Sequence, residues 1–166
     1  MAIRPIVSWP DPRLKAKAQA PAAFDAELRR LADDLLDTMR AAPGVGITAP
    51  HVGVALRLVV LELSAADGVR VYVDPTVIEA SAETIRHAEG SVSMPGVVDE
   101  VERAARVRVA YRDLDGVEKT EEAEGFLAVC LQHEIDQLDG VFWLDRLSRL
   151  KRDRTVKRWE KLRRRR

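Results

Sequence analysis

The chain is poor in the residues from which cross-links and metal sites are usually built. Its 166 residues include one cysteine and three histidines. A single cysteine, Cys130, excludes an internal disulfide, so the fold has to be stabilised by packing. This usage suits a reducing compartment, and we expect the protein to be cytoplasmic.

Long apolar runs are also missing. No run approaches the roughly 18 residues needed to span a membrane, and the start, MAIRPIVSWPDPR, lacks the apolar core of a secretory signal. We therefore expect no membrane contact. Hydrophobic residues make up 46% of the chain and charged residues 33%, which is typical of a globular protein. At this length a single domain over residues 1–166 is predicted.

The formal net charge is zero, but charge is distributed unevenly. From Arg149 to Arg166 there are eleven basic residues against Asp153 and Glu160. Because the whole chain is neutral, the rest is acidic by the same amount. We predict a basic C-terminal helix at about residues 147–166. Such a segment is typical either of a solvated helix end or of a surface that contacts an anionic partner such as RNA.

Apolar periodicity predicts an α+β fold. Leucines and a methionine at helical spacing predict a helix over Asp25–Arg40, with its apolar stripe in the core. Strands are predicted at 56–63, 69–73, 97–101, 106–111 and 117–123, the last at a sheet edge. Asp74-Pro75 is expected to break the second strand, 77–79 to restart it, and 89–96 to form a loop of small residues. The strands are grouped rather than alternating with helices, which favours small antiparallel or mixed sheets around a second helix.

The second helix is predicted to end in LQHEIDQLDG, residues 131–140, and Gly140 stops it. His133, Glu134 and Gln137 lie on one side of this helix. A zinc-hydrolase helix would read H-E-x-x-H, with two metal-binding imidazoles one turn apart and a glutamate base between them. Here Gln137 stands where the second imidazole would be. Taken alone, the His-Glu pair also fits a buried, hydrogen-bonded histidine.

Three segments resemble the signatures of the peptide deformylases, in the same order and at the same spacing. GVGITAPH (44–51) resembles G-x-G-L-A-A-x-Q, EGSVS (89–93) resembles E-G-C-L-S, and QHEIDQL (132–138) resembles Q-H-E-x-D-H-L. The flanking segments PDPRL (10–14) and DRL (145–147) agree as well. The resemblance covers nearly the whole chain and implies the deformylase fold, with an N-terminal helix, a central motif-bearing helix and a C-terminal helix.

In that family one cysteine and two histidines bind iron(II) or zinc, and the bound water attacks the formyl group of an N-terminal formylmethionine. Carried over by motif position, Ser91 replaces the cysteine, His133 is the retained histidine, Gln137 replaces the second, and Glu134 is the retained general base. A serine hydroxyl stays protonated and lacks the soft thiolate, and Gln137 offers only an amide oxygen. The resemblance implies a degenerate metal site, with no cofactor or a weakly bound Fe²⁺ or Zn²⁺.

The resemblance also assigns substrate contacts. His51 stands at the position of the glutamine that holds the oxyanion, and Val92 supplies the backbone N–H beside it. Gly46 and Val92 would pair their backbones with an extended peptide. Four residues would line an apolar slot for a methionine-like side chain, or would simply be core: Val45, Phe126, Val129 and Cys130.

Two further arrangements follow from the remaining residues. The chain's three histidines, His51, His87 and His133, could converge on one pocket and form a relocated metal site with Glu134. Arg103 is expected to pair with Glu89 and brace the second motif.

Three hypotheses for function remain open. The leading one is a deformylase-like protein with little or no deformylase activity that binds nascent (formyl)methionyl N-termini at the ribosome. The second is a metal-dependent hydrolase that removes formyl or another N-acyl group through a rearranged site. The third is a factor that associates with ribosomal RNA through the basic helix and has a vestigial pocket. Metal content and turnover distinguish the first two.

Overall fold

The computed structural model describes residues 2–165. Within these residues the helices are α1 (Ala26–Ala41), α2 (Gly125–Leu138) and α3 (Arg149–Arg164), with short 3-10 turns η1 (Pro12–Lys15), η2 (Ala49–Val52) and η3 (Trp143–Arg146). The strands are β1 (Gly46–Thr48), β2 (Leu58–Leu61), β3 (Arg70–Ala80), β4 (Thr84–Ser91), β5 (Met94–Ala104), β6 (Arg106–Arg112) and β7 (Glu118–Glu124). None of the helices in this part of the chain is long and apolar enough to cross a membrane.

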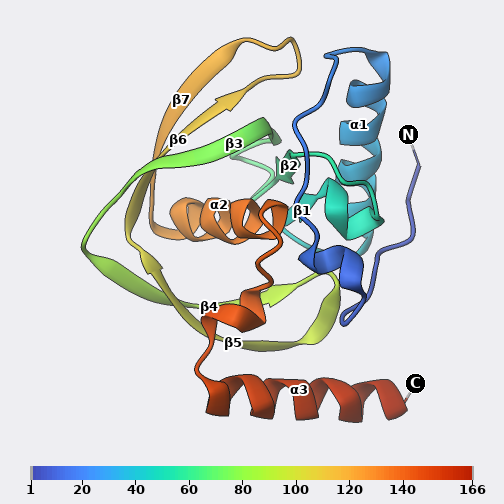
Figure 1. Ribbon diagram of the computed structural model, residues 1–166, viewed down its shortest axis with the longest axis vertical. Coiled ribbons are helices and arrows are strands. Elements are labelled where there is room, and N and C mark those ends of the chain that lie inside the picture. The colour runs from blue at the N-terminus through green and yellow to red at the C-terminus, as the bar shows by residue number, and fades with distance from the viewer. Residues whose placement is uncertain (1, 166) are drawn as a thin grey trace.

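The strands form two antiparallel sheets that curve around α2 (Figure 1). The larger sheet has the order β1-β2-β3-β6-β7, and β4 and β5 form a separate hairpin. The predicted α+β class is therefore confirmed. The helix that carries His133 and Glu134 runs through the centre of the molecule, so its side chains are covered from several directions (Figure 1).

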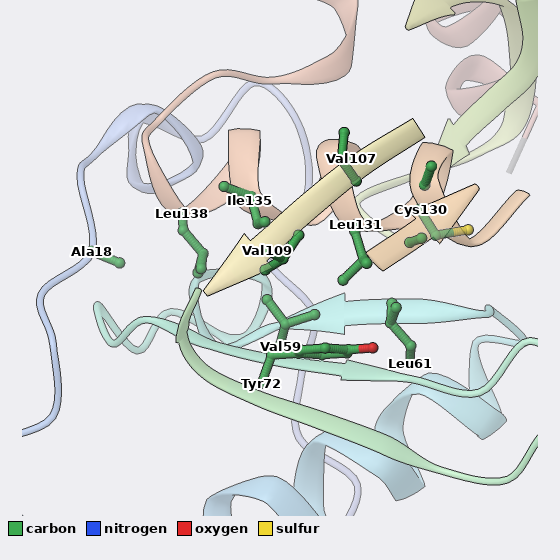
Figure 2. Packing of buried hydrophobic residues seen from close by; sticks show 12 residues of the cluster. Ala18, Val59, Leu61, Tyr72, Val107, Val109, Cys130, Leu131, Ile135 and Leu138 are labelled. Atoms are coloured by element: carbon green, nitrogen blue, oxygen red, sulfur yellow. The ribbon is translucent and has the colours of Figure 1, made fainter. Parts of the chain in front are cut away.

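Strand β2 shows why the larger sheet has two covered faces. All four of its residues are fully buried. Successive side chains of a strand point to opposite faces of the sheet, and each face of β2 is covered by a different helix. Val59 and Leu61 pack in the cluster with α2, and Figure 2 shows them below Leu131 of that helix. Leu58 and Val60 belong to the cluster with α1. An uninterrupted apolar run is the expected pattern for a strand with helices on both sides.

A third core fixes the C-terminal helix. Trp159 of α3 is 2% exposed and packs with Val97 and Val101 of β5 and with Trp143 of η3. The helix begins at Arg149, slightly later than predicted, because the Ser148 side chain caps it by accepting a hydrogen bond from the Lys151 N–H. Figure 1 shows α3 lying outside the β4–β5 hairpin. The predicted end of the basic segment, Arg166, lies outside the described residues.

Two details of the sequence interpretation were wrong. Asp74-Pro75 does not end a strand: β3 continues through it with an irregular register between Val73 and Thr76. Proline lacks the N–H that a ladder needs, and a bulge removes that requirement. Arg57 holds the bulge through its Nε–H to Asp74 Oδ1 (2.8 Å) and an Nη2–H to the Pro75 carbonyl (2.7 Å).

The second error concerns residues 89–96, predicted to be a loop. They form the closed end of the β4–β5 hairpin, with Ser91 opposite Met94. Small residues permitted the tight turn, but the strand pairing on either side continues almost to its tip. The second motif is thus held on a hairpin rather than on a free loop.

Candidate functional site

A cavity of about 410 Å³ lies between the segment leading into β1, the end of the β4–β5 hairpin and α2. Its lining includes every residue to which the motifs assigned a substrate role. Those residues are Val45, Gly46, His51, Val92, Phe126, Val129 and Cys130, and they are joined by Ser91, His133 and Glu134. The structure therefore brings the three motif segments together around one pocket.

Helix periodicity explains the contribution of α2. Phe126, Val129, Cys130 and His133 recur three or four residues apart, so they share one face of the helix. Glu134 follows on the same side and is 3% exposed. Gly46 of β1 lies against it: a Cβ at that position would lie 3.1 Å from Glu134 Oε2 and 2.8 Å from a Leu61 methyl. Only glycine lets β1 and the glutamate approach so closely.

His133 is oriented by a buried ion-pair network. Its Nδ1 lies 2.7 Å from Glu89 Oε1, and Arg103 donates to both oxygens of the same carboxylate at 2.6 and 2.9 Å. The predicted pairing of Arg103 with Glu89 is therefore confirmed. Arg103 also donates to Asp136 at 2.8 Å. Because an ionised carboxylate only accepts, Nδ1 carries the proton and the other ring nitrogen faces Glu134.

The ionisation of the pair follows from these contacts. Burial on its own would raise the pKa of Glu89, but hydrogen bonds from His133 and Arg103 outweigh it and lower the pKa to about 2. Burial lowers the pKa of His133, yet the hydrogen bond to Glu89 and the charge of Glu134 raise it above its ordinary value. Glu89 thus remains charged and holds the imidazole in place.

Glu134 has no such support. Its Oε1 lies 3.6 Å from His133 Nε2, and its Oε2 is buried with no hydrogen-bond partner among the described residues. Burial raises the pKa of Glu134 to about 7, which is the range suited to a general base or acid. Burial, followed by the nearby charge of Glu134, also raises the pKa of Cys130 to about 12. Cys130 is therefore an unreactive apolar wall.

His51 is a buried part of the pocket lining. It lies in η2, is 1% exposed, and its Nδ1 is 2.9 Å from both the main-chain nitrogen and the hydroxyl oxygen of Thr48. Its Nε2 is buried and has no partner among residues 2–165. Burial, reinforced by the charge of His133, lowers the pKa of His51 to about 3. The ring is therefore neutral.

Gln137 does not face the pocket. Its side chain is 2% exposed, and its amide Nε2 donates to the Leu14 carbonyl at 2.6 Å. Ser91 does line the pocket, but its hydroxyl oxygen accepts the Ser93 N–H at 3.1 Å. The side chain of Gln137 is therefore hydrogen-bonded to the backbone of Leu14, and that of Ser91 to the backbone of Ser93.

These residues do not match the donor set of a zinc or iron(II) centre. Within residues 2–165 no group of three or more His, Cys, Asp or Glu side chains is arranged to hold a metal ion. His87, a candidate for a relocated site, is exposed and stacks on Phe126 with ring centroids 4.8 Å apart. His133 Nε2 remains as one strong donor, with a carboxylate beside it, where a catalytic zinc needs three protein ligands.

The N-terminal segment has a role that the sequence interpretation missed. Its backbone contacts all three motif segments: Val7 N–H donates to the His51 carbonyl at 2.7 Å, Trp9 N–H donates to the Ser93 carbonyl at 2.9 Å, and Leu14 accepts from Gln137. Local periodicity carries no signal for such contacts. The only sequence signal for these contacts was the agreement of PDPRL (10–14) with the segment that precedes the motifs in the family. The contact of Thr48 with His51 was also missed, although the spacing Thr-x-x-His is that of a capping motif.

The geometry defines an α+β protein whose pocket is built on a helix bearing a His-Glu pair. Comparison with known proteins makes the assignment specific. The family model "Polypeptide deformylase" matches residues 3–153, so the chain belongs to the peptide deformylase family.

Individual relatives agree along the full length. A "Peptide deformylase-like" protein of Brucella melitensis biotype 1 is 65% identical over 99% of this chain and 100% of its own length. A "Peptide deformylase" of Phenylobacterium zucineum is 46% identical over 97% of both chains. The crystal structure of a peptide deformylase from Legionella pneumophila superposes with a TM-score of 0.92 at 40% identity, covering 98% of this chain and 96% of that one.

Proposed function

We propose that this protein binds the (formyl)methionyl N-termini of nascent peptides and has little or no deformylase activity. The observation that carries the proposal is the orientation of Gln137, whose amide donates to the Leu14 carbonyl instead of facing the pocket. His133 is then the one imidazole that α2 provides beside Glu134. One strong donor holds a divalent ion too weakly to stay bound at trace concentrations.

The chemical consequence follows from the pKa of water. Without a bound cation the attacking water keeps a pKa near 15.7 instead of roughly 7. A carboxylate base such as Glu134 is far too weak to deprotonate such a water at a useful rate. The residues of this chain are instead suited to binding. They provide an apolar slot, the open edge of strand β1 and the buried His51 Nε2, which has no hydrogen-bond partner among residues 2–165.

The walls of the pocket support a peptide ligand. Cys130 and Val129 are buried inside, whereas Val45 and Phe126 are each 39% exposed at the margin. Strand β1 is the outermost strand of the larger sheet and pairs with β2 on one side only. An extended peptide would add to that edge beside Gly46 and direct its first side chain into the slot.

A second candidate is a hydrolase that removes a formyl or other N-acyl group through a weak or rearranged metal centre. It is favoured by Glu134, a buried carboxyl with a raised pKa close to 7, which is the property a general base requires. It predicts turnover that depends on added metal.

We also propose that α3 brings the protein to the ribosome in the cytoplasm. Basic residues Arg154, Lys157, Lys161, Arg164 and Arg165 are exposed there and form no ion pair within residues 2–165. Such a surface would contact RNA phosphates without reading sequence. A pure ribosome-associated factor with an unused pocket is the limiting case in which no peptide binds.

The decisive experiment measures metal content, turnover and binding on one preparation. The protein is purified without oxygen, its iron and zinc are quantified, and it is tested against a formyl-Met-Ala-Ser peptide by calorimetry and by release of formate. We expect substoichiometric metal, no formate above background and saturable peptide binding. Stoichiometric metal with turnover would refute the leading proposal in favour of the hydrolase. The absence of peptide binding would refute both.

A further inference from the structure

Three groups of one wall of the pocket belong to the chemistry of serine hydrolases. Glu89 and Ser91 lie two residues apart on β4, with an irregular register between them. Side chains two positions apart on a strand point to the same face, and both of these line the cavity that His133 of α2 also lines. The pocket therefore brings together a hydroxyl group, an imidazole and a carboxylate, which are the members of a Ser-His-acid triad.

The imidazole of His133 is held in the form that can accept a proton. Its Nδ1 donates to Glu89 Oε1 at 2.7 Å, and the same carboxylate accepts two hydrogen bonds from Arg103. Because the ring proton is on Nδ1, the lone pair is on Nε2, which lies 3.6 Å from Glu134 of the pocket lining. A carboxylate that orients histidine through Nδ1 is the arrangement by which serine hydrolases position their general base.

The hydroxyl group of Ser91 is available as a nucleophile. Its oxygen accepts a hydrogen bond from the Ser93 N–H at 3.1 Å, whereas its own proton has no acceptor among residues 2–165. This N–H fixes the position of the oxygen and stabilises negative charge that develops on it. A serine hydroxyl becomes nucleophilic when a neighbouring base removes its proton, and His133 offers an unprotonated nitrogen in the same cavity.

We propose that the pocket has a metal-independent acyl-ester hydrolase activity, in which Ser91 is the nucleophile, His133 the general base and Glu89 the positioning residue. Ser91 Oγ forms a bond to the carbonyl carbon of an ester as its proton passes to His133 Nε2. The alcohol leaves with that proton, and the acyl group remains on Ser91. Water then attacks this acyl-serine with the help of the same base, which releases the carboxylic acid and restores the serine.

The proposed substrates are short acyl esters rather than the formyl amide of a peptide. An alcohol leaves more readily than an amine, so an ester demands less of the catalyst. Val129 and Cys130 form a buried apolar wall of the cavity, which suits a short aliphatic acyl chain. This activity goes beyond the proposed peptide binding, and neither depends on the other.

Hydrolysis of p-nitrophenyl acetate by protein treated with EDTA tests the proposal. We expect turnover that EDTA leaves unchanged and that Ser91→Ala and His133→Gln each lower by at least about a hundredfold. The matched control is Ser93→Ala, which removes the neighbouring hydroxyl, keeps the N–H that contacts Ser91, and should retain the activity. Glu89→Gln should be slow, because its amide can donate to the ring and move the proton to Nε2.

A covalent label gives a readout that a merely structural role of Ser91 would not produce. A fluorophosphonate reagent forms a bond to an activated serine oxygen as fluoride leaves, and peptide mass spectrometry locates the label. We expect labelling of the wild type at Ser91, and much slower labelling of Glu89→Gln. In ¹⁵N-histidine spectra, the ring that is missing from His133→Gln should carry its proton on Nδ1 in the wild type and on Nε2 in Glu89→Gln.

The outcomes separate this inference from the proposed function. Ester hydrolysis that survives Ser91→Ala, or that EDTA abolishes, overturns the triad. A wild type that neither hydrolyses the ester nor is labelled at Ser91 does the same, and this result requires no variant to fold. Calorimetry with formyl-Met-Ala-Ser on the same preparation tests the other proposal. Peptide binding without ester hydrolysis overturns only this inference, and ester hydrolysis without peptide binding overturns only the proposed function.

Discussion

Among single residues, Gln137 stands where the family has its second metal-binding histidine, and its amide stabilises the fold instead. Its amide bonds a carbonyl 123 residues away in the chain and is 2% exposed. Removing the amide leaves the Leu14 carbonyl without that donor, and a buried unpaired group costs about 1–3 kcal/mol. Gln137 thus has a structural role that a metal-binding histidine at this position would have to give up.

We predict from this that metal binding can be restored at a cost in stability. The double variant Ser91→Cys, Gln137→His should bind about one zinc per chain after dialysis, because a thiolate and a second imidazole then join His133. Each single variant should remain nearly empty. Elemental analysis measures the zinc, and an empty double variant would show that the pocket has changed beyond its ligands.

The stability cost is measured on the same proteins without metal. The free energy of unfolding of Gln137→His should fall by about 1–3 kcal/mol in denaturant titrations. Lys15→Ala, an exposed change in the adjoining segment, is the control and should stay within about 0.5 kcal/mol of the wild type. If both variants unfold alike, the Leu14 contact contributes nothing.

A second prediction at this scale concerns Arg103, which is 6% exposed and contacts Glu89 and Asp136. Arg103→Met should lower the free energy of unfolding by about 3–5 kcal/mol, because it leaves a buried carboxylate without its partner. Arg106→Met, which breaks the exposed pair with Glu83, is the matched control and should cost about 1 kcal/mol or less. Chemical denaturation of both variants checks the difference.

At the scale of elements, α3 supports the wall of the pocket from behind. Leu162 lies against Gly96, where an added Cβ would approach its methyl to 3.1 Å. Arg158 donates to the Val98 carbonyl at 3.1 Å, and Thr155 donates to Asp99 at 3.3 Å. These β5 residues, or their immediate neighbours, line the pocket on the opposite side. A loosened α3 should therefore affect ligand binding as well as stability.

Trp159→Ala tests this connection. Deleting a buried tryptophan costs about 3–5 kcal/mol, and we expect the affinity for formyl-Met-Ala-Ser to fall as well. The control is Leu150→Ala, because Leu150 lies on the same helix and is 68% exposed; it should change neither quantity appreciably. Calorimetry below the unfolding transition separates the two effects. Unchanged affinity in a destabilised, folded Trp159→Ala would show that α3 does not support the pocket.

At the scale of the whole molecule, charge is separated between the body and α3. Helix α3 lies outside the β4–β5 hairpin (Figure 1), and its residues are not part of the pocket lining. We predict cosedimentation with ribosomes that weakens steeply with salt, because phosphate contacts release counterions. Lys157→Gln with Lys161→Gln should reduce both the binding and its salt dependence. Lys17→Gln with Arg30→Gln, exposed elsewhere, is the control, and equal pelleting of both double variants would refute the contact.

Features that depend on neighbours along the chain could be predicted from the sequence. The helical spacing of Leu28, Leu31 and Leu35 was sufficient to predict α1, which begins at Ala26 because the Asp25 side chain caps it by accepting a hydrogen bond from the Leu28 N–H. The motifs were sufficient to predict the family and the residues that line the pocket. The strand break predicted at Pro75 was wrong, because the bulge that accommodates this proline is held by Arg57, a residue of another segment.

The roles of the site residues became apparent only in the folded chain. Periodicity placed Gln137 on a side of α2 but could not choose between the pocket and the Leu14 carbonyl, because that carbonyl comes from the far end of the chain. The charge of Glu89 likewise depends on hydrogen bonds from Arg103 and His133, which form only when other segments pack against it. The neutral ring of His51 depends on burial in the assembled fold. Local residues set the shape of each element, whereas hydrogen-bond partners and ionisation are properties of the assembled fold.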